Sequence, residues 1–233
     1  MPHEDWWFRI KEQKYLKETH WEKAAKTRMG KYLTETETEF IFQAITLSNC
    51  ASVIDVGAEA GRFSLLATEN ELEIIGIDID SYGLKRLKLK NRGVHIILAD
   101  ARKIPLREKV LDAAFMIEVL DYIAELETTL SECCNALKHG GSLILSFGNN
   151  SSLKSILRRS RGRTYQHSYG NVLHSLDKAG FKVKRKLGYN WLPFNRVSEN
   201  PLIPLLVRIE KVLGLRRLCR FSPWVLVYAV KSE

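Results

Sequence analysis

Short apolar runs alternate with amphipathic segments from about residue 50 to the end of the chain. The apolar runs are rich in β-branched residues and bounded by glycine or polar residues, which predicts buried strands. The expected strands are 52–57, 74–78, 94–100, 111–117, 142–147, 181–189 and 222–231, and the expected helices are 62–70, 81–91, 125–137 and 171–180. Because helices separate most of the strands, we expect an open α/β fold with a mostly parallel sheet covered on both faces.

The first 33 or so residues have an amphipathic helical pattern, with aromatic residues among many Lys and Glu. Thr34 is followed three residues later by Glu37, which is the capping-box spacing and predicts that a helix starts there. We expect one domain over 1–233, with an N-terminal helical cap at 1–47, a core at 50–190 and an insertion at 192–221.

The insertion has a basic amphipathic pattern. Leucines and isoleucines, including Leu205 and Ile209, recur at helical spacing beside Arg208 and Lys211. Such a helix could lie on an acidic membrane surface, or it could cover a substrate pocket together with the N-terminal helices. Packing of its apolar stripe against the domain is the more common arrangement.

Composition excludes several classes of protein. Hydrophobic residues make up 45% and charged residues 27%, as in soluble globular proteins. No uncharged apolar stretch approaches the ~18 residues of a membrane-spanning helix. The N-terminus shows no apolar signal-peptide region. The four cysteines form no metal-ligand spacing, so we expect no metal site and a reducing, cytoplasmic location.

Positive charge is concentrated toward the C-terminus. Residues 1–150 hold 19 Lys and Arg against 23 Asp and Glu, a balance of −4, and residues 151–233 hold 17 against 4, a balance of +13. The basic third predicts an anionic neighbour such as a phosphorylated substrate, nucleic acid or an acidic lipid surface. A solvated basic face without a partner is the alternative.

Glycine and acidic residues follow four successive strands. In open α/β sheets ligands bind at the carboxyl ends of the strands. The first strand ends in the glycine-containing turn 55–61, and the next three end at Asp78, Asp100 and Glu118. A carboxylate at Asp78 could accept hydrogen bonds from a ribose diol, and one at Asp100 could accept from an adenine amino group. Helix capping explains any one of these residues, but the series favours a nucleoside site.

The ordered segments VIDVGAEAGRFS, IIGIDID, ILADARKIPL, LDAAFMIEVLDYI and ALKHGGSLILSF resemble the motifs of class I S-adenosylmethionine-dependent methyltransferases, most closely the broad small-molecule group called type 11. The resemblance covers about residues 50–190. It implies a Rossmann-like sheet of seven strands, mostly parallel with an antiparallel last strand and flanked by helices. It also implies S-adenosyl-L-methionine as cofactor and S-adenosyl-L-homocysteine as product.

The resemblance implies a set of cofactor-binding residues. These are Asp55, Gly57, Glu59, Gly61, Asp78, Ile79, Asp100, Ala101 and Glu118. The two glycines would line the methionine part, with Asp55 orienting the loop. Asp78 would bind the ribose, Ile79 would lie beside the adenine, Asp100 and Ala101 would meet its edge, and Glu118 would lie near the sulfonium.

Glu59 departs from the family pattern, because it stands where the family usually has the middle glycine of the loop. A side chain there must adopt an unfavourable backbone conformation. Its carboxylate could meet the cofactor's ammonium group, or it could obstruct binding.

The segment 163–171 resembles the family segment that often reaches back over the substrate. A base for the acceptor is expected there, with Tyr165 and His167 as the candidates, although a histidine in a polar loop is more often merely exposed. We expect methyl transfer to a small or lipid-linked acceptor. RNA methylation by way of the basic third and a non-catalytic binding protein are the alternatives.

Overall fold

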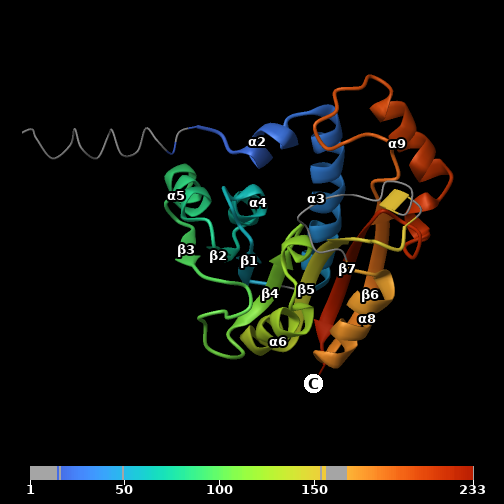
Figure 1. Cartoon of the computed structure of the whole chain (residues 1–233). Coiled ribbons are helices and arrows are strands. Elements are labelled where there is room, and N and C mark those ends of the chain that lie inside the picture. The colour runs from blue at the N-terminus through green and yellow to red at the C-terminus, as the bar shows by residue number, and fades with distance from the viewer. Residues whose placement is uncertain (1–14, 16, 49, 153, 156–166, 233) are drawn as a thin grey trace, which may run out of the picture.

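A seven-stranded sheet forms the centre of the computed structural model, which describes residues 15, 17–48, 50–152, 154–155 and 167–232 (Figure 1). Its strands are β1 (Ser52–Val56), β2 (Glu73–Asp78), β3 (His95–Leu98), β4 (Leu111–Met116), β5 (Leu137–Gly148), β6 (Phe181–Tyr189) and β7 (Trp224–Lys231). The strand order is β3-β2-β1-β4-β5-β7-β6. Strand β7 runs antiparallel to β5 and β6, and the other pairs are parallel. The predicted seven-stranded sheet is confirmed.

Helices cover both faces of this sheet. They are α2 (His20–Ala25), α3 (Arg28–Ser48), α4 (Arg62–Glu69), α5 (Ser81–Lys90), α6 (Leu126–Ala136), α8 (Tyr169–Lys178) and α9 (Ile203–Val212), with short 3-10 turns η1 (Leu120–Tyr122) and η2 (Leu215–Arg217). Successive residues of β1 point to opposite faces. Ile54 belongs to the apolar cluster that contains Leu130 of α6 and Leu176 of α8, and Val53 to the cluster with Phe40 of α3.

One local prediction is wrong. Helix α3 begins at Arg28 and passes through Thr34 without a break, so the capping box predicted there does not exist. A capping box occurs instead at Thr19 and Glu22, at the start of α2. Helix α6 ends at Ala136, within one residue of the predicted end, and Leu137 already pairs with Leu111 of β4.

The insertion before β7 is anchored to α3 through a buried carboxylate. Glu210 of α9 is 1% exposed, and it accepts hydrogen bonds from the Tyr32 hydroxyl at 2.7 Å and from Nε of Arg216 at 2.8 Å. One face of α9 therefore packs on the domain, as the more common arrangement predicted. Within the described part of the chain, no helix has the length and apolar character needed to cross a membrane.

Candidate active site

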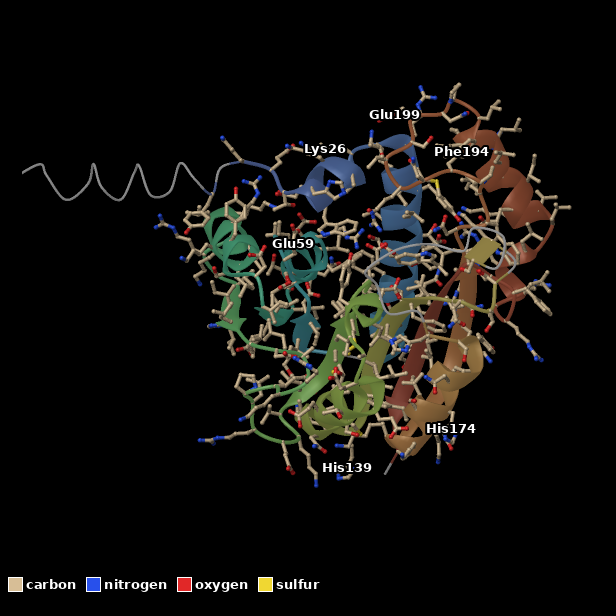
Figure 2. All side chains as sticks on the ribbon, in the orientation of Figure 1. Lys26, Glu59, His139, His174, Phe194 and Glu199 are labelled. Carbon is tan, nitrogen blue, oxygen red and sulfur yellow. The ribbon has the colours of Figure 1, made fainter. Side chains whose placement is uncertain are left out.

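A cavity of about 1320 Å³ opens at the carboxyl ends of β1, β2 and β4. Helix α2 covers it on one side, since His20, Trp21, Glu22 and Ala25 belong to its walls. All of the predicted cofactor-binding residues except Gly61 line this cavity. Glu59 lies in the space below α2, whereas His139 and His174 lie at the opposite end of the sheet (Figure 2).

Two glycines allow the loop after β1 to adopt its backbone conformation. Gly57 and Gly61 have φ values of 76° and 87°, in the left-handed region that side chains rarely adopt. A Cβ atom on Gly57 would lie 2.3 Å from Cγ2 of Val119, and one on Gly61 would lie 2.2 Å from Cδ1 of Leu87. Both positions therefore need glycine for backbone conformation and for space.

Glu59 occupies the same loop in a left-handed conformation, with φ at 47°. Such a conformation costs a non-glycine residue about 1–2 kcal/mol. Its carboxylate turns back to accept a hydrogen bond from the Ala60 amide at 2.9 Å. Gly83 of α5 presses on this residue, because a Cβ at position 83 would lie 2.9 Å from the carbonyl carbon of Glu59. The conformation of the loop is thus stabilised by its own hydrogen bond and by close packing against the backbone of α5.

Asp78 connects the glycine loop to the rim of the cavity. One carboxylate oxygen accepts from the Glu59 amide and the other from the Asp80 amide, both at 2.8 Å. A carboxylate offers about four acceptor positions, so each oxygen can accept a further hydrogen bond. The neighbouring Ile79 is 75% exposed on the cavity wall. Hydrogen-bond acceptors beside an exposed apolar side chain fit a ribose and the flat base attached to it.

Asp100 and Ala101 continue this wall at the end of β3. The Asp100 carboxylate receives hydrogen bonds from the backbone amide, Nε and Nη2 of Arg102. These hydrogen bonds hold the pKa of Asp100 below its usual range. The carboxylate therefore stays ionised and fixed in orientation beside Ala101. The sequence interpretation did not anticipate Arg102.

At the other end of the cavity, Glu118 lies between two arginines. Its Oε2 lies 2.8 Å from Nη2 of Arg62, and its Oε1 contacts Nη1 of Arg196. Arg62 also lies 3.3 Å from the fully buried carboxylate of Glu37, which accepts a hydrogen bond from the Tyr189 hydroxyl at 2.7 Å. We call Glu37, Arg62, Glu118 and Arg196 the charged cluster. Its members come from four separate segments of the chain.

The two carboxyl groups of the charged cluster differ in protonation. Burial, together with the charge of Glu118, raises the pKa of Glu37 to about 8. Burial alone would raise the pKa of Glu118 as well, but Arg62 and Arg196 hold it below its usual value. At neutral pH Glu118 is therefore ionised, and Glu37 largely retains its proton.

We expect Glu37→Gln to remove a pH dependence of stability. The unfolded chain loses this proton near the ordinary value of 4.5, and the folded chain retains it up to about 8. The free energy of unfolding of the wild type should therefore fall as the pH rises through this window, by at most about 1.4 kcal/mol per pH unit for one proton. Urea unfolding of both proteins at several pH values measures the difference. Glu39→Gln, on the exposed side of α3, is the control and should keep the wild-type slope. Equal slopes for wild type and Glu37→Gln would contradict the assignment.

Burial also affects Asp55, the carboxylate at the base of the glycine loop. It raises the pKa of Asp55 to about 6, although the Ser64 hydroxyl donates to Oδ2 at 2.6 Å and opposes the shift. Ser64 belongs to α4, which follows the loop directly. Asp55 thus ties the end of β1 to α4, and this geometry is consistent with its expected orienting role.

The structure does not support His167 as a base. Its ring is 7% exposed, and Nε2 donates to the carbonyl oxygens of Leu120 at 3.1 Å and Ile123 at 3.0 Å. His167 is not among the residues that line the cavity. His167 therefore binds the backbone of η1 and the residue after it, and it does not face the cavity. Tyr165 lies outside the described residues.

Several cavity residues were missed by the sequence interpretation, among them Trp21, Arg62, Tyr122 and Arg196. Arg62 follows the glycine loop directly, so the motif itself could have drawn attention to it. Glu37 behind it could also have been found, because it interrupts the apolar stripe of α3 at helical spacing from Leu33, Phe40, Ile41 and Ala44. Arg196 belongs to a segment with no periodic pattern and gave no such signal.

Comparison with known proteins bears on this site. A family described as "Methyltransferase domain" matches residues 54–145, which include the loop after β1 and the ends of β2, β3 and β4. The chain is 29% identical over 185 residues to a malonyl-[acyl-carrier protein] O-methyltransferase of Methylococcus capsulatus, covering 74% of this chain and 65% of that protein. It is 22% identical over 178 residues to 24-methylenesterol C-methyltransferase 3 of Arabidopsis thaliana, covering 68% of this chain and 49% of that protein.

A solved structure shares the fold. It is a geranyl diphosphate methyltransferase in complex with S-adenosylmethionine, with a TM-score of 0.63, 14% sequence identity and 84% of each chain covered. The chain spans less than two thirds of the length of the two curated relatives named above.

Proposed function

We propose that this chain is a class I S-adenosylmethionine-dependent methyltransferase, and that it transfers a methyl group from S-adenosylmethionine to a small or lipid-linked acceptor. The observation that carries the proposal is the rim of the cavity. There a glycine loop in left-handed conformation, the carboxylate of Asp78 and the exposed side chain of Ile79 lie together. This combination suits an adenosine with an amino-acid tail.

We assign the adenosine to the wall formed by the ends of β2 and β3. Asp78 would accept from the ribose hydroxyls, Ile79 would pack on the adenine, and Asp100 with Ala101 would meet its edge. The methionine part would lie along the loop at Gly57 and Gly61 and extend toward Glu118. When bound, the cofactor supplies a methyl group on a sulfonium, which is open to in-line attack.

The residues of the chain position the reactants and exclude water. Arg62 and Arg196 keep Glu118 ionised and fixed at the methyl end. Helix α2 covers the cavity, since Trp21 and Glu22 line it. Where the acceptor must lose a proton, Asp121 is a better candidate than His167 because it lines the cavity and burial raises its pKa. It also accepts a hydrogen bond from the Gly148 amide at 2.9 Å, which fixes its orientation.

Three observations favour a small or lipid-linked acceptor. The cavity of about 1320 Å³ exceeds the roughly 300–1,000 Å³ of an ordinary ligand pocket, so it has room for a second molecule beside a nucleoside. Trp21, Val197 and Trp224 add apolar surface to its walls. The names of the similar proteins mention malonyl-[acyl-carrier protein], 24-methylenesterol and geranyl diphosphate.

Calorimetry with S-adenosylhomocysteine tests the proposal, followed by a transfer assay with labelled S-adenosylmethionine and a panel of lipid extracts and small acids. We expect binding tighter than about 1 mM and label in one acceptor class. Glu59→Gly serves as a matched variant, since it restores the usual loop residue and should bind at least as well. Absence of heat from the wild type at millimolar ligand, with heat from Glu59→Gly, would favour a non-catalytic protein.

A further inference from the structure

Large apolar side chains are exposed together on one segment of the described chain. They are Val197, Leu202, Leu205, Ile209, Val212, Leu213, Leu218 and Phe221, which we call the apolar patch. Val212 is 85% exposed and Leu213 64%. Soluble monomers rarely leave such side chains grouped on the surface, and a grouped patch usually marks an interaction site. Helix α9, which carries its centre, lies at the outer edge of the molecule (Figure 1).

Helix α9 is apolar on two opposite faces. Its inner face packs on the domain through Ile203, and Glu210 is fixed there by Tyr32 and Arg216. Its outer face carries Leu205, Ile209 and Val212 at positions i, i+4 and i+7, which form one stripe along the helix. Because the buried carboxylate fixes the rotation of the helix, the inner face cannot turn outward to exchange with this stripe.

Positive charge borders the patch. Arg208, Lys211, Arg217 and Arg220 are exposed, and none of them takes part in the ion pairs found among the described residues. The only acidic residue between positions 200 and 223 is Glu210, which is buried and paired with Arg216. An apolar stripe bordered by unpaired cations is the pattern of helices that lie in the interface of anionic membranes.

We propose that the apolar patch and its basic border dock on an anionic lipid surface, with Val212 and Leu213 entering the interface. Aliphatic side chains dominate the patch, whereas single-stranded nucleic acid is bound by aromatic side chains that stack on bases. The lipid surface is therefore the better fit.

Docking would bring the cavity toward the lipid. Arg196 and Val197 line the cavity and belong to the same insertion as α9. Helices α2 and α9 lie at the same end of the sheet, where the parallel strands end (Figure 1). A lipid-linked acceptor would thus reach the cavity from the surface to which the protein is bound. The entry of a lipid-linked acceptor into the cavity rests on the proposed methyl transfer. The docking on the lipid surface does not depend on it.

Vesicle co-sedimentation tests the docking with the full chain. We expect the wild type to bind vesicles of equal parts phosphatidylcholine and phosphatidylglycerol, and to bind pure phosphatidylcholine much more weakly. Val212→Glu with Leu213→Glu should weaken binding to the mixed vesicles at least about tenfold, because it places two acidic groups in the interface. The control is Leu47→Glu with Leu98→Glu, at side chains 71% and 62% exposed outside the patch, and it should bind like the wild type.

Calorimetry with S-adenosylhomocysteine on every variant separates the two proposals. Vesicle binding that is equal for wild type and the patch variant would overturn the docking, as would binding by the wild type to a single-stranded RNA and not to the vesicles. Loss of vesicle binding with retained nucleoside binding supports the docking. If the wild type fails to bind the nucleoside, the methyltransferase proposal is contradicted. The conclusion from the vesicle experiment is not affected by that result.

Discussion

Replacing Arg62 by methionine is expected to lower the free energy of unfolding by less than the about 3–5 kcal/mol that removing one partner from a fully buried ion pair costs, because the Arg62 side chain is 24% exposed. Arg62 is the guanidinium that Glu37 and Glu118 share, at 3.3 Å and 2.8 Å. Without it, Glu37 has only the Tyr189 hydroxyl, and Glu118 depends on Arg196 alone. Methionine keeps much of the volume, so the loss reports the charge and its hydrogen bonds. Urea unfolding at pH 7 gives the value.

Two further variants make this experiment decisive. Adding Glu118→Gln to Arg62→Met should restore part of the stability, since the second change removes a carboxylate that Arg196 alone would otherwise have to balance. Arg102→Met is the control, because Arg102 pairs with Asp100 and Glu125 at the surface and such pairs contribute little. If Arg62→Met and Arg102→Met had equal small effects, the charged cluster would not stabilise the fold.

Asp78→Ala is expected to weaken binding of S-adenosylhomocysteine about 10- to 150-fold, which corresponds to the ~1.5–3 kcal/mol of hydrogen bonds to a charged group. The substitution removes the acceptor assigned to the ribose. It also frees the amide of Glu59, which Asp78 holds at 2.8 Å. Calorimetry on the purified variant measures the loss, and thermal unfolding shows whether the protein is still folded.

Ligand variation tells whether the lost contact is to the ribose. Binding of 5′-methylthioadenosine, which has the ribose but no amino-acid part, should fall by a similar factor. Binding of 2′,3′-dideoxyadenosine, which lacks both hydroxyls, should change little. Asp177→Ala, on the exposed side of α8, is the matched control. Unchanged affinity of Asp78→Ala for S-adenosylhomocysteine would remove the ribose assignment.

The fold could be predicted because its signals are strong and local. The strands are short apolar runs that end at glycine or aspartate, and the sheet brings these ends together. Most of the predicted rim therefore lies around one cavity. The helix start at Thr34 was wrong because a capping-box spacing is a local signal, and the apolar stripe of α3 continues across it.

The end of the cavity around Arg62 and Arg196 could not be predicted in the same way. Its charged cluster joins residues that are far apart in the sequence and belong to four segments, so no local spacing connects them. His167 was chosen because the segment 163–171 resembles a family segment that reaches over the substrate, but it is buried beneath η1 by contacts to Leu120 and Ile123. Pattern alone does not show which way a loop residue faces.

The close approach of Gly83 to Glu59 affects how this protein should be aligned with others. Only a residue without a side chain fits at position 83 while the loop keeps its present course. The restriction to glycine therefore extends from the loop to α5, although α4 and β2 lie between them in the chain. A signature written from the loop alone treats Glu59 as a defect. A signature that also includes position 83 records a restriction to glycine that the backbone of the loop imposes, whatever side chain position 59 carries.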